Sequence, residues 1–133
     1  MEHAFAEHTG EVEVHLMAAD LGGLFEEAGR ALAELMLGES GTPSGEAEMV
    51  TLQASDRETL MFEWLNELVF RSETEKVVFT DFEVDEISDT KLVAEIRGVE
   101  PQSIRTAVKA ATFHRLEIAD TADGCEATVV FDV

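Results

Sequence analysis

Two stretches of the chain repeat apolar residues every three or four positions. The first begins after Asp20 and ends before Gly38. The second begins after Ser55-Asp56-Arg57-Glu58, a sequence typical of a capping box with Ser55 at the N-cap. Each stretch carries one apolar stripe and is predicted to form an amphipathic helix. These two helices are the strongest constraint on the fold, because the rest of the chain must supply the surface that buries their stripes.

Most of the remaining chain alternates polar and apolar residues, as half-buried strands do. The expected strands cover residues 11–16, 49–54, 77–84, 92–97, 112–118 and 125–133. The inward parity shifts between Phe79 and Phe82, which predicts a bulge near Thr80. Asp123-Gly124 predicts a tight hairpin turn before the last strand. Residues 101–111 fit either a short helix or a strand, and the N-terminal end around His3 is expected to be mobile.

The order of the expected elements is β-α-β-α-β-β-β-β, with the ambiguous short element before the last two strands. This order predicts an α+β fold of two layers: a mixed sheet of about six strands with both helices packed on one face. The chain of 133 residues fits one domain, 1–133.

The charge balance excludes some partners. Nine basic against 29 acidic side chains give a net charge of −20. Such a surface repels phosphate backbones and anionic lipids, so neither strong nucleic-acid binding nor membrane binding is expected. It favours a basic protein partner, divalent cations or simple solubility. Cys125 is the only cysteine, which suits a reducing compartment such as the cytoplasm.

The residues alone leave the chemistry open. Glu11 opens the first strand, and Asp132 stands next to Val133 at the end of the sequence. These groups either form a hard-oxygen site for Mg²⁺ or Ca²⁺, or fray with their charges in solvent, and residue spacing alone favours fraying. His8 and His114 are each either hydrogen-bonded structural residues or functional ones.

A basic segment interrupts the acidic pattern. Residues 97–115 hold four basic side chains against one acidic side chain. The segment either offsets its acidic neighbours or contacts a phosphate or a partner's carboxylates, and the first interpretation is favoured.

Six segments of the chain, taken in order, resemble the motifs of the archease family. They are Glu7–Val12, Leu24–Ala28, Trp64–Leu68, Val78–Val84, Lys109–His114 and Val129–Val133. Each motif alone is modest, but the series covers nearly the whole chain. The fold that the resemblance implies, a mixed sheet with two helices, agrees with the order of elements expected above.

The resemblance implies an accessory protein and not an enzyme. Archeases assist the RtcB-type RNA ligase of tRNA splicing and RNA repair, whose GTP-dependent guanylylation and repeated turnover they promote. GTP is thus used by the partner ligase, and the expected location is the cytoplasm.

The resemblance also implies a divalent cation, Ca²⁺ or Mg²⁺, held by Glu11, Asp132 and Val133. The family has Asp where this chain has Glu11, and Ala where it has Gly10. The longer Glu side chain places its oxygens further out, which Ca²⁺ tolerates better than Mg²⁺. Four residues are expected to support the site or to contact the partner: His8, Thr9, Lys109 and His114.

Two other functions are consistent with the sequence. A stand-alone metal-dependent hydrolase or nucleotide-handling enzyme would use the carboxylates, the histidines and the basic segment, and would turn over GTP without a partner. A general chaperone-like protein would expose apolar surface, for which Phe62, Phe70 and Phe79 are the candidates, and would suppress the aggregation of clients.

Overall fold

The computed structural model describes residues 1–8, 10–39, 41–43 and 45–133, without the side chains of residues 7 and 8. Its two helices are α1 (Leu21–Met36) and α2 (Arg57–Glu75). Its strands are β1 (Glu2–His8), β2 (Glu11–Ala18), β3 (Leu37–Glu39), β4 (Thr42–Pro43), β5 (Glu48–Gln53), β6 (Val78–Ile87), β7 (Lys91–Glu100), β8 (Ser103–Ile104), β9 (Ala110–Thr121) and β10 (Gly124–Asp132). The expected α+β class is confirmed.

The strands do not form one sheet. The first sheet has the antiparallel order β1-β2-β10-β9. In the second sheet, β6 pairs with one edge of β7, while β4 and β5 follow one another along the other edge. A small third sheet joins β3 to β8. The prediction of a single sheet of about six strands is therefore wrong, because alternation within a strand does not reveal which strands pair.

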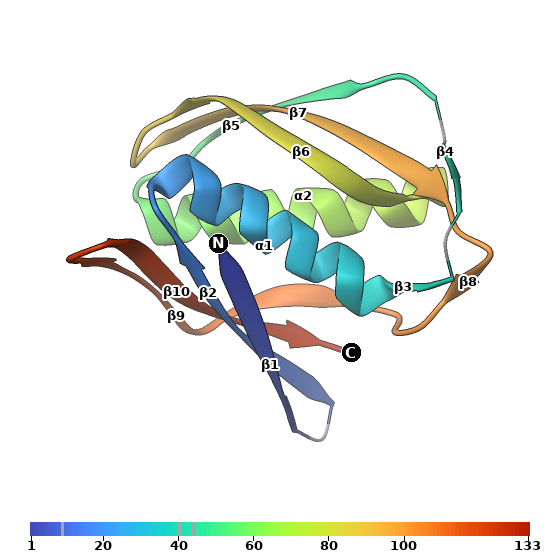
Figure 1. The fold of residues 1–133 in the computed structure, drawn as a ribbon, viewed down its shortest axis with the longest axis horizontal. Helices are drawn as coiled ribbons and strands as arrows, with labels where there is room; N and C mark the ends of the chain where they lie inside the picture. The colour runs from blue at the N-terminus through green and yellow to red at the C-terminus, as the bar shows by residue number, and fades with distance from the viewer. Residues whose placement is uncertain (9, 40, 44) are drawn as a thin grey trace.

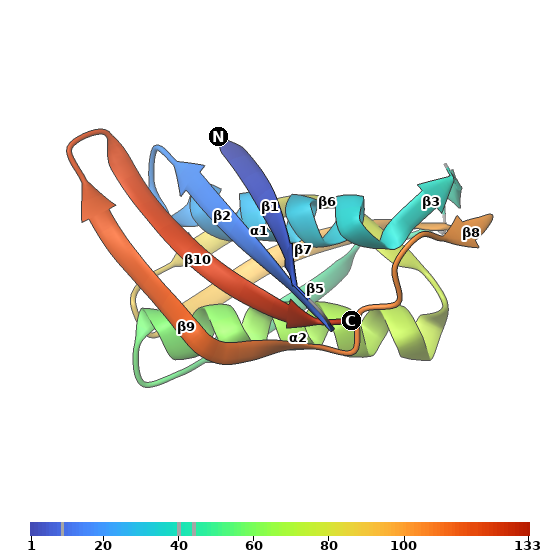
Figure 2. The ribbon, with the colours of Figure 1, turned by 90° about the horizontal axis from the view of Figure 1, so that it is seen from below.

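Both helices lie between the two larger sheets (Figures 1 and 2). Helix α1 contacts β2 of the first sheet and β6 of the second. Helix α2 contacts β9 of the first sheet and β5 of the second. The prediction that both helices cover one face of one sheet is thus wrong. The apolar surface of each helix is broad enough to be buried from two sides, which produces a three-layered core.

The N-cap of α1 agrees with the prediction from sequence, and that of α2 does not. Asp20 caps α1 as expected, and its carboxylate accepts the Gly23 N–H at 2.7 Å. The predicted capping box of α2 is wrong. Asp56, not Ser55, is the N-cap and accepts the Thr59 N–H at 2.7 Å. The adjacent Ser and Asp are both good N-caps, so the sequence does not separate them.

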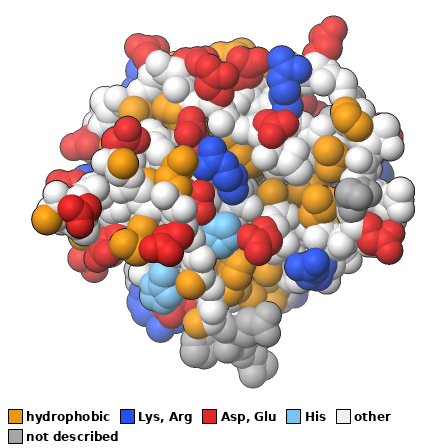
Figure 3. Space-filling view, in the orientation of Figure 1, with side chains coloured by type: hydrophobic (Ala, Val, Ile, Leu, Met, Phe, Trp, Pro, Cys, Tyr) orange, Lys and Arg blue, Asp and Glu red, His pale blue; other side chains and the backbone are white. Residues whose placement is uncertain are grey.

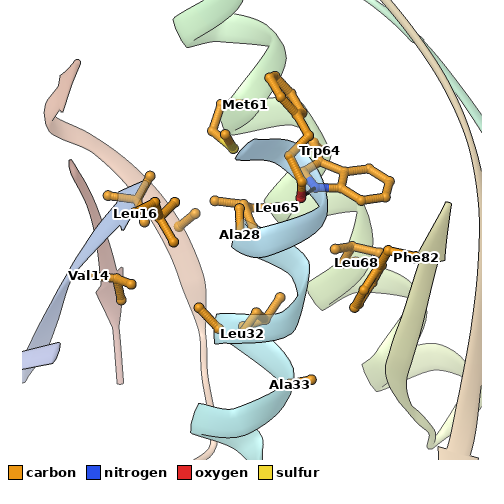
Figure 4. Close-up of a cluster of buried hydrophobic side chains, with 14 of the residues drawn as sticks. Val14, Leu16, Ala28, Leu32, Ala33, Met61, Trp64, Leu65, Leu68 and Phe82 are labelled. Atoms are coloured by element: carbon orange, nitrogen blue, oxygen red, sulfur yellow. Dashed lines mark hydrogen bonds between the residues drawn. The ribbon is translucent and has the colours of Figure 1, made fainter. Parts of the chain in front are cut away.

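Side chains from both sheets and both helices meet in one core (Figure 4). Trp64 of α2 lies at its centre without exposed surface, and its indole N–H donates to the Phe25 carbonyl at 2.9 Å. The ring also packs edge-on against Phe82 of β6, with 6.0 Å between centroids. Trp64 therefore joins both helices to the second sheet.

Two expected local features of the strands are confirmed. The register of β6 against β7 shifts between Phe79 and Asp81, at the predicted bulge. The hairpin between β9 and β10 turns at Ala122 and Asp123, directly before Gly124, whose φ of +150° favours glycine. The ambiguous segment 101–111 contains only the two residues of β8 and the start of β9, so it is not helical.

The N-terminal segment is a strand, contrary to the expected mobile end. Residues of β1 pair with β2 in continuous register from Glu2 to His8. His3 also joins β1 to helix α1: its Nδ1 lies 2.6 Å from the buried carboxylate of Glu27, and its Nε2 contacts Glu34. Arg30 shares Glu27 at 3.2 Å. A histidine near a chain end gives no sequence signal of partners 24 and 31 residues away.

The contact of His3 predicts a dependence of stability on pH. Burial lowers the pKa of His3, but hydrogen bonds and charges of Glu27 and Glu34 outweigh it and raise this pKa above 6.5. A group whose pKa is raised by folding stabilises the protein below its unfolded pKa, and loses that contribution as the pH rises through its folded pKa. The free energy of unfolding should therefore fall between about pH 6 and about pH 9, and by less in His3→Gln. Urea denaturation at both pH values measures this, and identical falls in both proteins would refute the assignment.

Within the described ranges, no helix is long and apolar enough to cross a membrane.

Candidate functional site

Two carboxylates lie opposite each other at one end of the first sheet. Glu11 is the first residue of β2 and Asp132 is the last of β10, and the two are direct partners in the antiparallel register. Such partners share a face of the sheet, with Cβ atoms about 4.5–5.5 Å apart. Their neighbours Val12 and Phe131 point into the core, so Glu11 and Asp132 project from the outer face. Both are half-buried.

Main-chain hydrogen bonds fix this end of the sheet. The Val133 N–H donates to the Gly10 carbonyl at 3.1 Å, and the Lys109 N–H donates to the Asp132 carbonyl at 2.8 Å. Gly10 has a φ of +75°, which glycine adopts without strain. Glu11, Asp132 and Val133, here called the carboxylate site, are thus held side by side by the backbone, and the main chain of Lys109 lies next to Asp132.

The structure describes His114 fully, but only part of His8 and none of Thr9. The backbone of His8 pairs with that of Glu11, but its side chain lies outside the described part of the chain, and so does all of Thr9. His114 is exposed, although strand alternation would turn it toward the side of Ile118. The alternation fails because β9 bulges: Thr112 and Glu117 pair with Val130 and Thr128, so four residues of β9 span a single residue of β10.

The bulge also brings in Arg115, which the sequence analysis placed only within the basic segment. Its guanidinium lies 3.7 Å from the carboxylate of Glu11 and 3.5 Å from that of Glu13. Its φ of +58° is unusual for a residue with a side chain. To reach β2 from β9, the side chain crosses the outer face of β10. Val130 lies on that outer face, because its neighbours Val129 and Phe131 point to the core, and yet it is fully buried.

Helix α2 fixes the strand that carries the bulge. The Asn66 side chain donates to the Ala111 carbonyl at 3.1 Å and accepts the Ala111 N–H at 2.9 Å. In the first turn of α2, the Glu58 carboxylate accepts the Ile118 N–H at 3.1 Å. Among the described residues β9 is an edge strand of its sheet, and these main-chain groups lie on its open edge. Side chains of α2 thus satisfy an otherwise open sheet edge and hold β9 against β10.

Replacing Asn66 by Ala should therefore weaken the fold. The change removes two hydrogen bonds and leaves the Ala111 N–H and carbonyl without their partners, which costs about 1–3 kcal/mol of the free energy of unfolding. Urea denaturation measures the loss, and amide exchange at Ala111 should become faster. Glu63→Ala, an exposed change on the same helix, is the control. Unchanged stability and exchange in Asn66→Ala would contradict the role given to Asn66.

The oxygen atoms of the carboxylate site are suitable ligands for a hard cation. Carboxylate and main-chain oxygens are the ligands that Ca²⁺ and Mg²⁺ prefer. Among the residues that the structure describes, no three or more His, Cys, Asp or Glu side chains converge in a way that could hold a metal. The site therefore offers two carboxylates from the described side chains, with the main-chain oxygen of Val133 beside them.

Comparison with known proteins places the chain. A model of the Archease protein family matches residues 3–133. The chain belongs to the archease family. Protein archease of Methanosarcina acetivorans is 33% identical to this family member over 141 residues, which cover 99% of this chain and 96% of the relative. Protein archease of Methanothermobacter thermautotrophicus is 36% identical over 122 residues, which cover 86% of each chain.

One solved structure supports the same placement of this archease family member, and a second shares its fold. The solution structure of protein 1598 of Methanobacterium thermoautotrophicum superposes with a TM-score of 0.77 at 29% identity, and covers 98% of both chains. The crystal structure of an archease from Thermotoga maritima, described as a possible chaperone, gives a TM-score of 0.66 at 21% identity and covers 96% of this chain and 94% of its own. The second likeness concerns the fold alone.

Proposed function

We propose that this family member is an accessory protein that activates an RtcB-type RNA ligase, by promoting its GTP-dependent guanylylation and its repeated turnover in tRNA splicing or RNA repair. Membership of the archease family supports the proposal. The observation that carries it is the direct pairing of Glu11 with Asp132 beside Val133. Two carboxylates of like charge repel each other, and a bound cation or a basic group lowers that repulsion.

The carboxylate site is proposed to hold Ca²⁺ or Mg²⁺. Glu11, Asp132 and the main-chain oxygen of Val133 would be the ligands from this chain. Both cations accept at least six oxygen ligands, so most of the coordination sphere stays open. Phosphate oxygens commonly complete such spheres, and the GTP of the ligase would supply them. Lys109 lies beside the site on its main-chain hydrogen bond to Asp132, and its ammonium group would contact phosphate or the partner, as would His114 from the exposed bulge.

The net charge favours a protein partner over RNA. The chain carries −20, and acidic side chains outnumber basic ones on the face shown in Figure 3. This surface would be attracted to a basic, phosphate-binding face of the ligase, and docking should weaken as salt is added. RNA would then be bound by the ligase and not by this chain. The cytoplasm is the proposed location, since the lone Cys125 is a free buried thiol.

A guanylylation assay tests the proposal. The cognate ligase is incubated with labelled GTP, with and without the purified protein, and the labelled ligase is followed in time. We expect faster labelling and several rounds of RNA joining when the protein is present. No change in either quantity would contradict the proposal. Two side reactions separate the alternatives: GTP turnover by the protein alone would favour an enzyme, and suppressed aggregation of unrelated clients would favour a chaperone.

The chaperone alternative has weaker support from the named aromatic residues. Phe79 is only 4% exposed and belongs to the core. Phe62 is half-buried, and stacks on Phe113 with 4.3 Å between centroids. Among the three candidates only Phe70, at 63%, is exposed, and a single exposed side chain of this kind is normal for a protein surface.

A further inference from the structure

Arg115 already places a positive charge on the proposed cation site. Its guanidinium contacts Glu11 at 3.7 Å and Glu13 at 3.5 Å. Because Glu11 is also a proposed cation ligand, its carboxylate is offered to two positive groups at once. This inference rests on the cation site proposed above and concerns what controls that site.

The local backbone aims Arg115 at the site. Arg115 lies within the four-residue bulge of β9 and has a φ of +58°. A side-chain-bearing residue in this region of φ costs free energy, and such positions and bulges occur often at functional sites. The bulge lifts Arg115 out of the regular alternation and sends its side chain across β10. A regular strand would have kept the guanidinium over its own neighbours in β9.

The ion pair between Arg115 and Glu11 is exposed to solvent. The Arg115 side chain is 48% exposed and that of Glu11 is 38% exposed, so both remain in contact with water. Exposed ion pairs of this kind contribute little free energy, so little is lost when the guanidinium leaves Glu11. Glu13, whose side chain is only 16% exposed, is the more enclosed of the two partners. The Arg115–Glu11 pair is therefore the weaker of the two links.

We propose that Arg115 competes with the divalent cation for Glu11. Without the cation, the guanidinium neutralises the carboxylate site and lowers the repulsion between Glu11 and Asp132. When the cation binds, it takes over Glu11, and the guanidinium leaves that carboxylate. Arg115 is thus a tethered competitor that sets the affinity of the site and prevents cation binding and the Arg115–Glu11 pair from occurring together.

Calorimetric titration with CaCl₂ alone, without ligase, tests this competition. Arg115→Gln keeps a side chain of similar length but removes the charge. We expect it to bind Ca²⁺ about two- to fivefold more tightly than the wild type, the range for one exposed ion pair that no longer competes. Arg97→Gln is the matched control, because Arg97 pairs with Glu95 in the other sheet and is similarly exposed, at 56%. It should change the affinity less than about twofold.

A second measurement on the wild type separates competition from a general effect of charge. The Nε–Hε signal of Arg115 in NMR should move toward the position of a free arginine as Ca²⁺ saturates the site, while that of Arg97 stays in place. An Arg115 signal that does not change at saturation, or equal affinity of Arg115→Gln and the wild type, would overturn the competition while leaving ligase activation intact. If neither protein binds Ca²⁺, the competition and the cation site both fail, and the guanylylation assay still decides whether the ligase is activated.

Discussion

Trp64→Ala should remove a large share of the free energy of unfolding, about 3–5 kcal/mol. Trp64 has no exposed surface and contacts both helices and β6. Removing a buried aromatic side chain of this size costs about 3–5 kcal/mol, because it leaves a cavity as well as losing burial. The Phe25 carbonyl also loses its indole donor. Domains of this size have a total stability of about 5–15 kcal/mol, so the loss is a large share.

Circular dichroism during urea denaturation measures this loss, since Trp64 is the only tryptophan and its fluorescence disappears with the substitution. Phe70→Ala is the matched control on the same helix, because Phe70 is 63% exposed and its loss should cost less than about 0.5 kcal/mol. Equal stability of the two variants would contradict the description of the core.

Replacing both Glu11 and Asp132 by Ala should abolish cation binding. The two carboxylates are the proposed side-chain ligands, and the remaining main-chain oxygens cannot hold Ca²⁺ or Mg²⁺ against water alone. The fold should tolerate the change, because both side chains project from the outer face and are only half-buried. Calorimetry with CaCl₂ should show no heat of binding, while the urea denaturation midpoint stays close to that of the wild type.

The control for this double variant is Glu117→Ala with Glu126→Ala. Both residues are exposed, and they lie on β9 and β10 of the same sheet. The control therefore removes the same amount of charge from the same sheet, away from the carboxylate site. It should bind Ca²⁺ as the wild type does. Similar binding by the two double variants would refute the assignment of Glu11 and Asp132 as ligands.

The local elements were predictable because their signals are local. The apolar stripe of α1 and its cap at Asp20 need only residues within one helix, and both are confirmed. The bulge in β6 left a shift of parity between Phe79 and Phe82. The N-cap of α2 was predicted wrongly, because Ser55 and Asp56 are adjacent and both are suitable N-caps. The structure uses Asp56.

Features that depend on distant partners were not predictable. The division of the strands between two sheets and the anchoring of β1 by His3 need contacts between segments far apart in sequence. Asn66 reaches Ala111 across 45 residues, and nothing in its surroundings marks it as the residue that holds β9. The bulge around Arg115 was not predictable either, because it depends on the register between β9 and β10.

The candidate site came from family resemblance and not from spacing. Residue spacing alone favoured a frayed end at Asp132 and Val133. The structure instead pairs Asp132 with Glu11 and bonds Val133 to Gly10. Two acids separated by most of the chain give no periodic signal, and their pairing becomes visible only when β2 and β10 are known to be neighbours.

The most direct test of the central claim is the guanylylation rate of the cognate ligase with three proteins at equal concentration: the wild type, Glu11→Ala with Asp132→Ala, and Glu117→Ala with Glu126→Ala. The account predicts stimulation by the wild type and by the second double variant, and none by the first. Full stimulation by Glu11→Ala with Asp132→Ala, in a protein shown to be folded, would contradict the claim that the carboxylate site activates the ligase.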